Sequence, residues 1–477
     1  MSGVSSRTVA KQILGTGGLQ AVGQVASFLG VIAYTQLLPR EILGSYFLLV
    51  AVLQIASFLG ANGVTSDITR RLNQSETPGR ELANAVCFTA VVTSALTVGA
   101  YLAQPVVAAY VRNQFGLFLV ALLPVSVFAL LTGAVLRGEQ KNTSAETMTA
   151  CQRVTTYTTG SLALLVGVEP RLALVGGLFS GKLLELGGGL LRIDTVPVGI
   201  PRPDELGRLT RRVAKLTVAG MGHLGQQWLD TLLVGVFMTP AAVAVYEVAW
   251  RLSAVGLMVT NAVTSVLYPR FAQAASAGDR AAINRYANRA FFYVSSPMVA
   301  LVAGALALGP MLVTALYGTN YADAYLPLVV LLVGRLPYSL ARITTMLSYS
   351  YNFDTGVAKA SIAAALVNAG LNVALIPTIG ITGAALGSLV SYTVLAVLLF
   401  ELVSDRVDRP QFAQFLPSIA AAGVMFGSVS VLAELLPETV PGLLTLVAVG
   451  AVLFSGTLLA SSPTLRTDIK HVLPQSE

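Results

Sequence analysis

Long apolar runs dominate the chain, and short segments rich in proline, glycine and charged residues separate them. A helix needs about 20 mostly apolar residues to cross the roughly 30 Å hydrocarbon core of a bilayer. Fourteen runs approach or reach this length, so the pattern predicts an all-α polytopic membrane protein with fourteen transmembrane helices. The predicted spans are 12–36, 43–67, 82–103, 115–136, 144–168, 171–191, 213–237, 241–268, 288–309, 324–348, 356–376, 381–401, 412–435 and 441–460.

The distribution of lysine and arginine predicts which helix ends face the cytoplasm. With the N-terminus placed inside, 22 of the 30 basic residues fall in inner segments, three fall in outer segments and five fall within the spans. Basic residues concentrate in the cytoplasmic loops of membrane proteins. We therefore expect a multi-pass plasma-membrane protein with both termini in the cytoplasm. The outer loops are short, so no extracellular catalytic domain is predicted.

Composition narrows the class further. Hydrophobic residues make up 55% of the 477 residues and charged residues only 11%, too few to cover a soluble protein of this size. This excludes a soluble enzyme, a disordered chain and a nucleic-acid-binding domain. The two cysteines, Cys87 and Cys151, lie in apolar stretches and are interpreted as packing residues. With two histidines and no catalytic sequence motif, neither a transition-metal site nor enzyme activity is predicted.

The two halves of the chain share a pattern. Tyr46 and Arg70 stand 24 residues apart around the second span, and Tyr246 and Arg270 stand 24 residues apart around the eighth. Six spans per half is an even number, so the halves would be parallel repeats. The predicted organisation is an N-terminal lobe at 1–192, a cytoplasmic linker at 193–212, a C-terminal lobe at 213–403, and helices 13 and 14 with a cytoplasmic tail at 404–477.

An ordered set of segments resembles the multidrug/oligosaccharidyl-lipid/polysaccharide (MOP) flippase superfamily, most closely its polysaccharide-transporter branch of Wzx-like lipid-linked oligosaccharide flippases. The segments are LLPREILGSYFLLVAVLQIASFLGANG, WLDTLLVG, VAVYEVAWRLS, LYGTNYADAYLPLVVLL and LVNAGLNVALIPTIGITGAALGSLVSY. The resemblance implies two six-helix lobes that rock around a central cavity lined by helices 1, 2, 7 and 8. A fourteen-helix member is similar to the lipid II flippase branch, in which helices 13 and 14 build a groove for the lipid tail.

Charged residues inside the spans call for a partner or a function, because each costs about 2.5–3.5 kcal/mol at mid-bilayer on insertion scales. Lys182 and Glu185 stand three residues apart on the sixth span and can pair with each other. Arg153 on the fifth span has no acidic neighbour in sequence. It either pairs with Glu185 across the lobe or faces the cavity. Asp67 stands near the inner end of the second span and is predicted to be interfacial.

Arg251 is the leading candidate for substrate binding. It lies near half depth of the eighth span, one turn from Glu247, and a pair with Glu247 is the alternative interpretation. By resemblance, its position matches a cavity arginine of the lipid II flippase, and a guanidinium binds phosphate oxygens through two parallel hydrogen bonds. Arg335 and Arg342 share a face of the tenth span. They are secondary candidates for phosphate or sugar, with intralobe pairing or snorkelling as the alternative.

Four amides are candidates for glycan binding. Gln20, Gln24, Gln54 and Asn62 occupy helices 1 and 2, where the lipid II branch carries cavity arginines. Amides hydrogen-bond sugar hydroxyls but neutralise no charge. This departure favours a glycan carrying fewer phosphates over lipid II. Hydrogen bonding between helices is the alternative for each amide.

A cation site is also implied by the resemblance to the lipid II flippase, which has a sodium site in its second lobe. The matching residues are Asp230, Asn368, Asn372 and Ser388. Carboxylate, amide and hydroxyl oxygens suit a hard cation such as Na⁺. The alternative is that the asparagines join helices and Asp230 pairs with Arg251. His223, on the face of Asp230, would favour H⁺ coupling if it relays protons, and a polar cavity or packing residue is the favoured interpretation.

These features together predict a flippase. It would move an oligosaccharide linked to a polyprenyl phosphate or diphosphate from the cytoplasmic to the outer leaflet, for cell-surface polysaccharide or glycan synthesis. The bilayer and a polysaccharide polymerase or glycosyltransferase machinery are the expected partners. A multidrug or cation exporter of the same superfamily is the alternative, although such a cavity favours acidic and aromatic residues and these spans are net basic. A polytopic glycan polymerase is disfavoured by the short outer loops.

Overall fold

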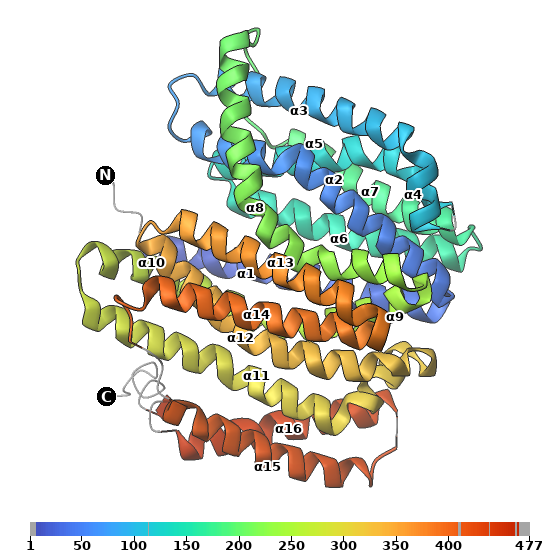
Figure 1. The fold of residues 1–477 in the computed structure, drawn as a ribbon, viewed down its shortest axis with the longest axis vertical. Helices are drawn as coiled ribbons and strands as arrows, with labels where there is room; N and C mark the ends of the chain where they lie inside the picture. The colour runs from blue at the N-terminus through green and yellow to red at the C-terminus, as the bar shows by residue number, and fades with distance from the viewer. Residues whose placement is uncertain (1–5, 113, 409–411, 438, 463–464, 467–477) are drawn as a thin grey trace. The chain divides into compact units, whose positions relative to one another are not determined.

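The computed structural model consists of α-helices with a few 3-10 turns, and no strand occurs among the residues that it describes (Figure 1). These residues are 6–112, 114–408, 412–437, 439–462 and 465–466. The all-α prediction is confirmed for this part of the chain. Of the basic residues that set the predicted topology, Arg409 and Lys470 lie outside it, as does most of the predicted C-terminal tail.

The chain divides into two compact units, residues 1–247 and 248–477. The division falls within one helix, α9 (Pro240–Ala254). This division reflects which helices pack together. The lobe and linker boundaries predicted from the sequence stay a prediction.

The first unit is a helical bundle. Its elements are α1 (Ser6–Leu37), α2 (Arg40–Leu72), α3 (Pro78–Leu102), α4 (Gln104–Val111), η1 (Phe115–Phe118), α5 (Leu119–Gly138), α6 (Asn142–Leu165), α7 (Pro170–Leu190), α8 (Pro203–Phe237) and the start of α9. Helix α6 packs on α1 and α7, and α2 packs on α5 and α8. Glycine permits the close approach of α7 to α6, since a Cβ on Gly177 would lie 2.5 Å from the carbonyl oxygen of Thr156. Prolines begin α3, α7 and α8, where a missing N–H leaves no helical bond unmade.

The second unit continues from α9 and is a second helical bundle. Its elements are α10 (Leu257–Ser276), α11 (Arg280–Tyr317), η2 (Thr319–Ala324), α12 (Tyr325–Ser350), α13 (Asp354–Ile379), α14 (Ile381–Val403), η3 (Phe412–Phe415), α15 (Leu416–Ala433) and α16 (Val440–Ser461). Helix α12 packs on α11 and α14, and α13 packs on α14. Helices α15 and α16 pair with each other and rest on α11, as Figure 1 shows.

Helices stand at all the positions predicted to cross the membrane, but they differ in polarity. Within the described residues, ten helices are long and apolar enough to span a bilayer, and the bent pair α9 and α10 would make an eleventh. Helices α6, α7 and α8 coincide with predicted spans but fall outside that set. The span predicted at 241–268 is not one straight helix, because the chain bends by 43° between α9 and α10. The short α4 was not predicted.

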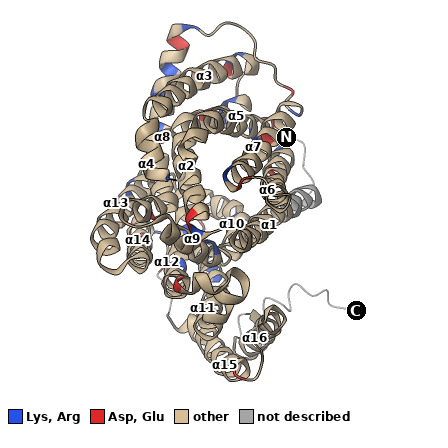
Figure 2. Cartoon of the chain, turned by 90° about the vertical axis from the view of Figure 1, so that its right-hand side faces the viewer, with Lys and Arg blue, Asp and Glu red and all other residues tan. Residues whose placement is uncertain are grey.

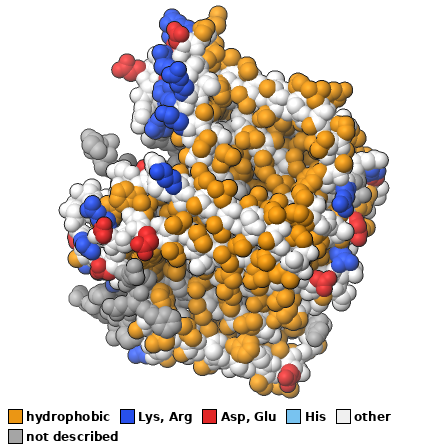
Figure 3. All heavy atoms as spheres, in the orientation of Figure 1, with side chains coloured by type: hydrophobic (Ala, Val, Ile, Leu, Met, Phe, Trp, Pro, Cys, Tyr) orange, Lys and Arg blue, Asp and Glu red, His pale blue; other side chains and the backbone are white. Residues whose placement is uncertain are grey.

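The surface is that of a membrane protein. Charged residues are sparse along most of the helices (Figure 2). Hydrophobic side chains cover much of the face in Figure 3, and lysine and arginine gather where α8 begins. Large apolar side chains such as Leu165, Leu366 and Val452 are more than half exposed along the helices. Soluble monomers rarely expose contiguous apolar surface of this extent. The chain is therefore a multi-pass membrane protein.

Candidate functional site

Two carboxylates lie buried between α8 and α9 in the first unit. The Tyr246 hydroxyl donates to Oδ2 of Asp230 at 2.6 Å, and the Thr231 hydroxyl donates to Oε1 of Glu247 at 2.6 Å. Asp230 is 5% exposed and Glu247 is 2% exposed. A buried carboxylate is costly unless hydrogen bonds stabilise it. Each hydroxyl therefore contributes to holding a carboxylate in the interior of the first unit.

The spacing of these four residues explains the pairing. Each donor and acceptor stand 16 residues apart, 230 with 246 and 231 with 247. Helix α8 ends at Phe237 and α9 begins at Pro240, so the chain folds back at once and brings the two segments side by side. The roles of Tyr246 and Thr231 were missed in the sequence analysis. The adjacent pairs Asp-Thr and Tyr-Glu flanking a tight helical hairpin are the signal that could have revealed them.

Arg335 is enclosed within the second unit. Its side chain is 2% exposed, and its guanidinium carbon lies 5.1 Å from the Trp250 ring, 5.7 Å from the Tyr392 ring and 5.9 Å from the Tyr338 ring. Nε donates to the Ser253 hydroxyl at 3.2 Å, and Nη1 donates to the Tyr392 hydroxyl at 3.4 Å. Nη2 has no hydrogen-bond partner among the described residues. Aromatic faces stabilise this cation where no carboxylate of the described chain does.

The other arginines of the second unit are less enclosed. Arg251 is half-buried in the last turn of α9, just before the bend, and interacts electrostatically with Tyr317. Arg342 is half-buried on α12 and donates from Nη2 to the amide oxygen of Asn261 at 3.5 Å, at the limit of a hydrogen bond. The predicted pair of Arg251 with Glu247 stays a prediction.

In the first unit, polar candidates follow the contact between α1 and α6. Arg153 on α6 is half-buried, with its Cδ 3.2 Å from the position a Cβ would take on Gly23 of α1. Its side chain makes no ion pair or hydrogen bond with any residue that the structure describes. Lys182 and Glu185 form the predicted ion pair at 2.8 Å, so the alternative that Arg153 pairs with Glu185 is not realised. Gln20 donates to Glu146 of α6 at 3.1 Å.

Helices α1 and α2 carry the other three candidate amides. Gln24 on α1 is exposed and Gln54 on α2 is half-buried. Asn62 donates to the carbonyl oxygen of Leu216 on α8 at 3.4 Å, a contact between two helices. Asp67, predicted to lie near the membrane interface, is 2% exposed within the protein. It is bound by two arginines, Arg71 at 3.2 Å and Arg212 at 3.1 Å.

The two asparagines of the candidate cation site face the same side of α13. Asn372 donates from Nδ2 to Oδ1 of Asn368 at 3.1 Å, and both side chains are buried. The Oδ1 atom of Asn372 is directed at α14, where a Cβ on Gly387 would lie 2.6 Å from it. Ser388, the next residue, is also buried. Three of the four predicted ligands thus belong to one contact between α13 and α14.

Asp230 belongs to the other compact unit, so the four-ligand cation site stays a prediction. His223 is exposed on α8. Within the described residues, no group of three or more histidine, cysteine, aspartate and glutamate side chains could hold a metal ion. The oxygen chemistry of amides and a hydroxyl fits an alkali cation better than a transition metal.

Comparison with known proteins places this arrangement in a family. The chain is 24% identical over 450 residues to the Probable low-salt glycan biosynthesis flippase Agl15 of Haloferax volcanii. The match covers 93% of this chain and 93% of that protein. Its fold is similar to that of the lipid II flippase MurJ in an inward closed conformation, with a TM-score of 0.78 at 13% identity, covering 94% of this chain and 97% of that one. It is also similar to an inward-facing multidrug resistance MATE transporter of the MOP superfamily, with a TM-score of 0.64 at 17% identity, covering 80% and 94%.

The family model for polysaccharide biosynthesis proteins matches residues 35–326, which is more than half of the chain. This match runs from the end of α1 to the start of α12 and so includes both buried carboxylates of the α8–α9 hairpin. The chain therefore belongs to the polysaccharide biosynthesis protein family, and it has the fold of MOP-superfamily flippases and transporters.

Proposed function

We propose that this protein flips a lipid-linked oligosaccharide from the cytoplasmic to the outer leaflet by alternating access. Its family and the flippase name of its Haloferax relative support this function. The observation that carries it concerns two basic side chains, Arg153 on α6 and Arg335 on α12. Neither has a carboxylate partner among the described residues. Basic residues inside membrane helices often mark substrate sites. A phosphate-linked glycan supplies the missing negative charge.

The basic residues would bind the phosphate, and the amides would bind the sugars. Arg251 is the leading phosphate ligand in this proposal, because it is half-buried at a helix bend and keeps its charge in any environment. Arg153, Arg335 and Arg342 would contribute further positive charge. Gln20, Gln24, Gln54 and Asn62 are the proposed glycan contacts. Only the position of the lipid changes, so no covalent step is assigned to the protein.

The proposed topology has fourteen membrane crossings and cytoplasmic termini. It counts the polar helices α6, α7 and α8 as crossings, because each packs against apolar neighbours of the first unit. Helices α15 and α16 would hold the lipid tail beside the second unit. Polymerase or glycosyltransferase machinery would supply or consume the glycan at the two faces of the membrane.

Ion coupling is a further part of the proposal. Asn368, Asn372 and Ser388 would bind Na⁺ when Asp230 joins them, and H⁺ coupling through the buried carboxylates is the alternative. The buried amide oxygens of α13 and α14 support the first version. Asp230→Asn is then expected to abolish any stimulation of transport by a sodium gradient. Unchanged sodium dependence in this variant would exclude the site.

The experiment that tests the proposed function is a flipping assay in vesicles, with defined lipid-linked glycans and with or without a Na⁺ gradient. Arg251→Ala is expected to abolish flipping while the protein still inserts and folds. Arg211→Ala removes an exposed arginine of α8 and serves as the matched control. Wild-type flipping by Arg251→Ala would remove this residue from the mechanism, and absence of flipping by the unmodified protein with every glycan would refute the function.

Export of cationic drugs is the second candidate, and the buried carboxylates Asp230 and Glu247 favour it. The MATE-like fold is compatible with it. The same vesicles distinguish the two, because an exporter would move a cationic dye and leave an anionic lipid in place. We favour the flippase because the charged residues of the predicted spans are net basic.

A further inference from the structure

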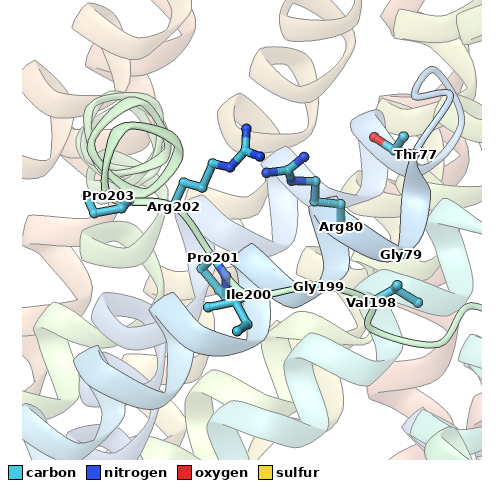
Figure 4. Close-up of a pocket in the computed structure, with 9 residues that line it drawn as sticks. All are labelled: Thr77, Gly79, Arg80, Val198, Gly199, Ile200, Pro201, Arg202 and Pro203. Carbon is cyan, nitrogen blue, oxygen red and sulfur yellow. The ribbon is translucent and has the colours of Figure 1, made fainter.

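A pocket of about 770 Å³ lies where the segment between α7 and α8 crosses the start of α3 (Figure 4). It is lined by Thr77, Gly79, Arg80, Val198, Gly199, Ile200, Pro201, Arg202 and Pro203. No carboxylate is among these residues. The pocket belongs entirely to the first unit and involves none of the residues of the proposed transport site.

Two arginines face each other across this pocket. Figure 4 shows the guanidinium groups of Arg80 and Arg202 extending toward one another from α3 and from the segment before α8. Arg80 is held in place by Glu205, with Nη2 to Oε1 at 2.8 Å and Nε to Oε2 at 3.2 Å. The Arg202 side chain is exposed and makes no hydrogen bond or ion pair with a described residue, but its charge helps to lower the pKa of Glu205, so one carboxylate interacts with both arginines. Glu205 supplies one negative charge beside two positive ones, so a further anion in the pocket would balance the charge that remains.

The segment that carries Arg202 is fixed rather than loose. The Val198 N–H donates to the Gly79 carbonyl oxygen at 2.9 Å. At the other end, Glu139 accepts hydrogen bonds from the backbone N–H groups of Asp194 and Thr195 at 3.1 Å and 2.8 Å. Gly199 adopts a φ of +89°, a conformation that side chains disfavour, and so turns the chain back over α3.

The same segment displays apolar side chains outward. Leu191 and Ile200 are each 88% exposed, Val196 is 67% exposed and Val198 is 63% exposed. Helix α3 is a candidate membrane span that begins at Pro78, one residue from Thr77 and Gly79 in the pocket wall. The pocket therefore stands at the boundary between membrane and water. Exposed apolar side chains beside arginines at that level are typical of a surface that binds an anionic membrane.

We propose that residues 191–202 form an interfacial anchor, in which Leu191, Val196, Val198 and Ile200 enter the bilayer surface and Arg80 and Arg202 bind the phosphate of an anionic lipid headgroup. The pocket is large enough for a headgroup, and its two guanidinium groups match a phosphate that carries negative charge on several oxygens. The ligand is a lipid of the surrounding membrane and is separate from any transported lipid.

Lipid binding to the full-length protein in neutral detergent tests the pocket. The probe is dihexanoyl phosphatidylglycerol, measured by the shift in thermal unfolding, with dihexanoyl phosphatidylcholine as the uncharged reference. Arg202→Gln is expected to weaken phosphatidylglycerol binding about fivefold, the usual effect of one basic residue at a membrane surface. Arg211→Gln, on an exposed arginine outside the pocket, should leave binding unchanged.

The other outcomes of this titration contradict the proposal. Equal weakening by Arg202→Gln and Arg211→Gln would indicate a diffuse basic surface. Equal protection by inorganic phosphate at the same concentration would indicate a site for a free anion. Equal protection by phosphatidylcholine would show that the charge of the headgroup plays no part.

A second measurement tests the anchor without changing the arginines. A nitroxide is attached through Ile200→Cys in a Cys87→Ala/Cys151→Ala background, and the protein is placed in phosphatidylglycerol nanodiscs. The nitroxide should collide more with oxygen, which concentrates in lipid, than with a water-soluble nickel complex. The same label at Gly207, exposed on α8, is the matched control and should favour the nickel complex. Water-like accessibility at position 200 would overturn the anchor.

Discussion

The hydrogen bond from Tyr246 to Asp230 offers the sharpest test of the α8–α9 hairpin. At 2.6 Å it connects a buried hydroxyl to a buried carboxylate. Tyr246→Phe removes the hydroxyl and keeps the ring, so packing is preserved. Tyr34→Phe is the matched control, because Tyr34 is equally buried but donates to the neutral carbonyl oxygen of Thr156 at 3.2 Å.

The expected magnitudes follow from the charge of the acceptor. Loss of a hydrogen bond to a charged group costs about 1.5–3 kcal/mol, and loss of one between neutral groups costs about 0.5–1.5 kcal/mol. Tyr246→Phe should therefore lower the free energy of unfolding by about 1–2 kcal/mol more than Tyr34→Phe. At roughly 2–4 °C per kcal/mol for a unit of this size, the two variants should differ in Tm by about 2–8 °C. Thermal unfolding of both variants in the same detergent and at the same scan rate measures this difference.

A third variant tests whether the carboxylate carries the charge. In an Asp230→Asn background the acceptor is neutral, so Tyr246→Phe should cost only about 1 kcal/mol. The double-mutant cycle isolates the pair from the other contacts of each residue. Equal destabilisation by Tyr246→Phe and Tyr34→Phe, together with no coupling in the cycle, would refute the idea that Asp230 is a hydroxyl-stabilised anion.

Three further predictions concern other parts of the molecule. The Arg335→Met variant should keep the thermal stability of the unmodified protein within a few degrees, because an apolar side chain of similar length suits the three aromatic rings around Arg335. Its flipping activity in vesicles should fall at least tenfold, and full activity would contradict a role in transport. Gly79→Ala should release the segment before α8, because a Cβ would lie 2.7 Å from the Val196 carbonyl oxygen, and proteolysis of that segment should accelerate. The Asn84 amide and then Arg80 hold the pKa of Glu205 below its ordinary 4.5, so its stabilisation is complete above that value and is lost as pH falls through the lowered pKa. Spin-label mobility at position 200 should rise only below about pH 4.5, and a rise at neutral pH would contradict this assignment.

Much of the fold was predictable because membrane helices satisfy their own backbone hydrogen bonds and must be apolar over a fixed length. The bend after α9 was not predicted, and it occurs where the chain meets residues distant in sequence. A Cβ on Gly256 would lie 2.8 Å from both Leu301 and Met298 of α11. The close approach of α11 at this point, and not the local apolar pattern, accompanies the interruption of the predicted span at 241–268.

The contacts of the candidate site likewise include some that the sequence predicts and others that it does not. The pair of Lys182 and Glu185 could be predicted because three residues of helix determine its geometry. The cage of Arg335 could not, because Trp250 and Tyr392 come from α9 and α14, 85 and 57 residues away. Side-chain chemistry can be listed from sequence, but its partners are set by helix packing, which apolar patterns leave undetermined.

The polarity of α6, α7 and α8 has a consequence for how the protein is made. In the proposed fourteen-crossing topology these three helices are less apolar than the other crossings, and they pack against α1, α2 and α5 in the first unit. A translocon would therefore have to retain them until their partners emerge and release the group together. Biogenesis of this half should be cooperative, and truncation after α6 should leave that helix outside the bilayer.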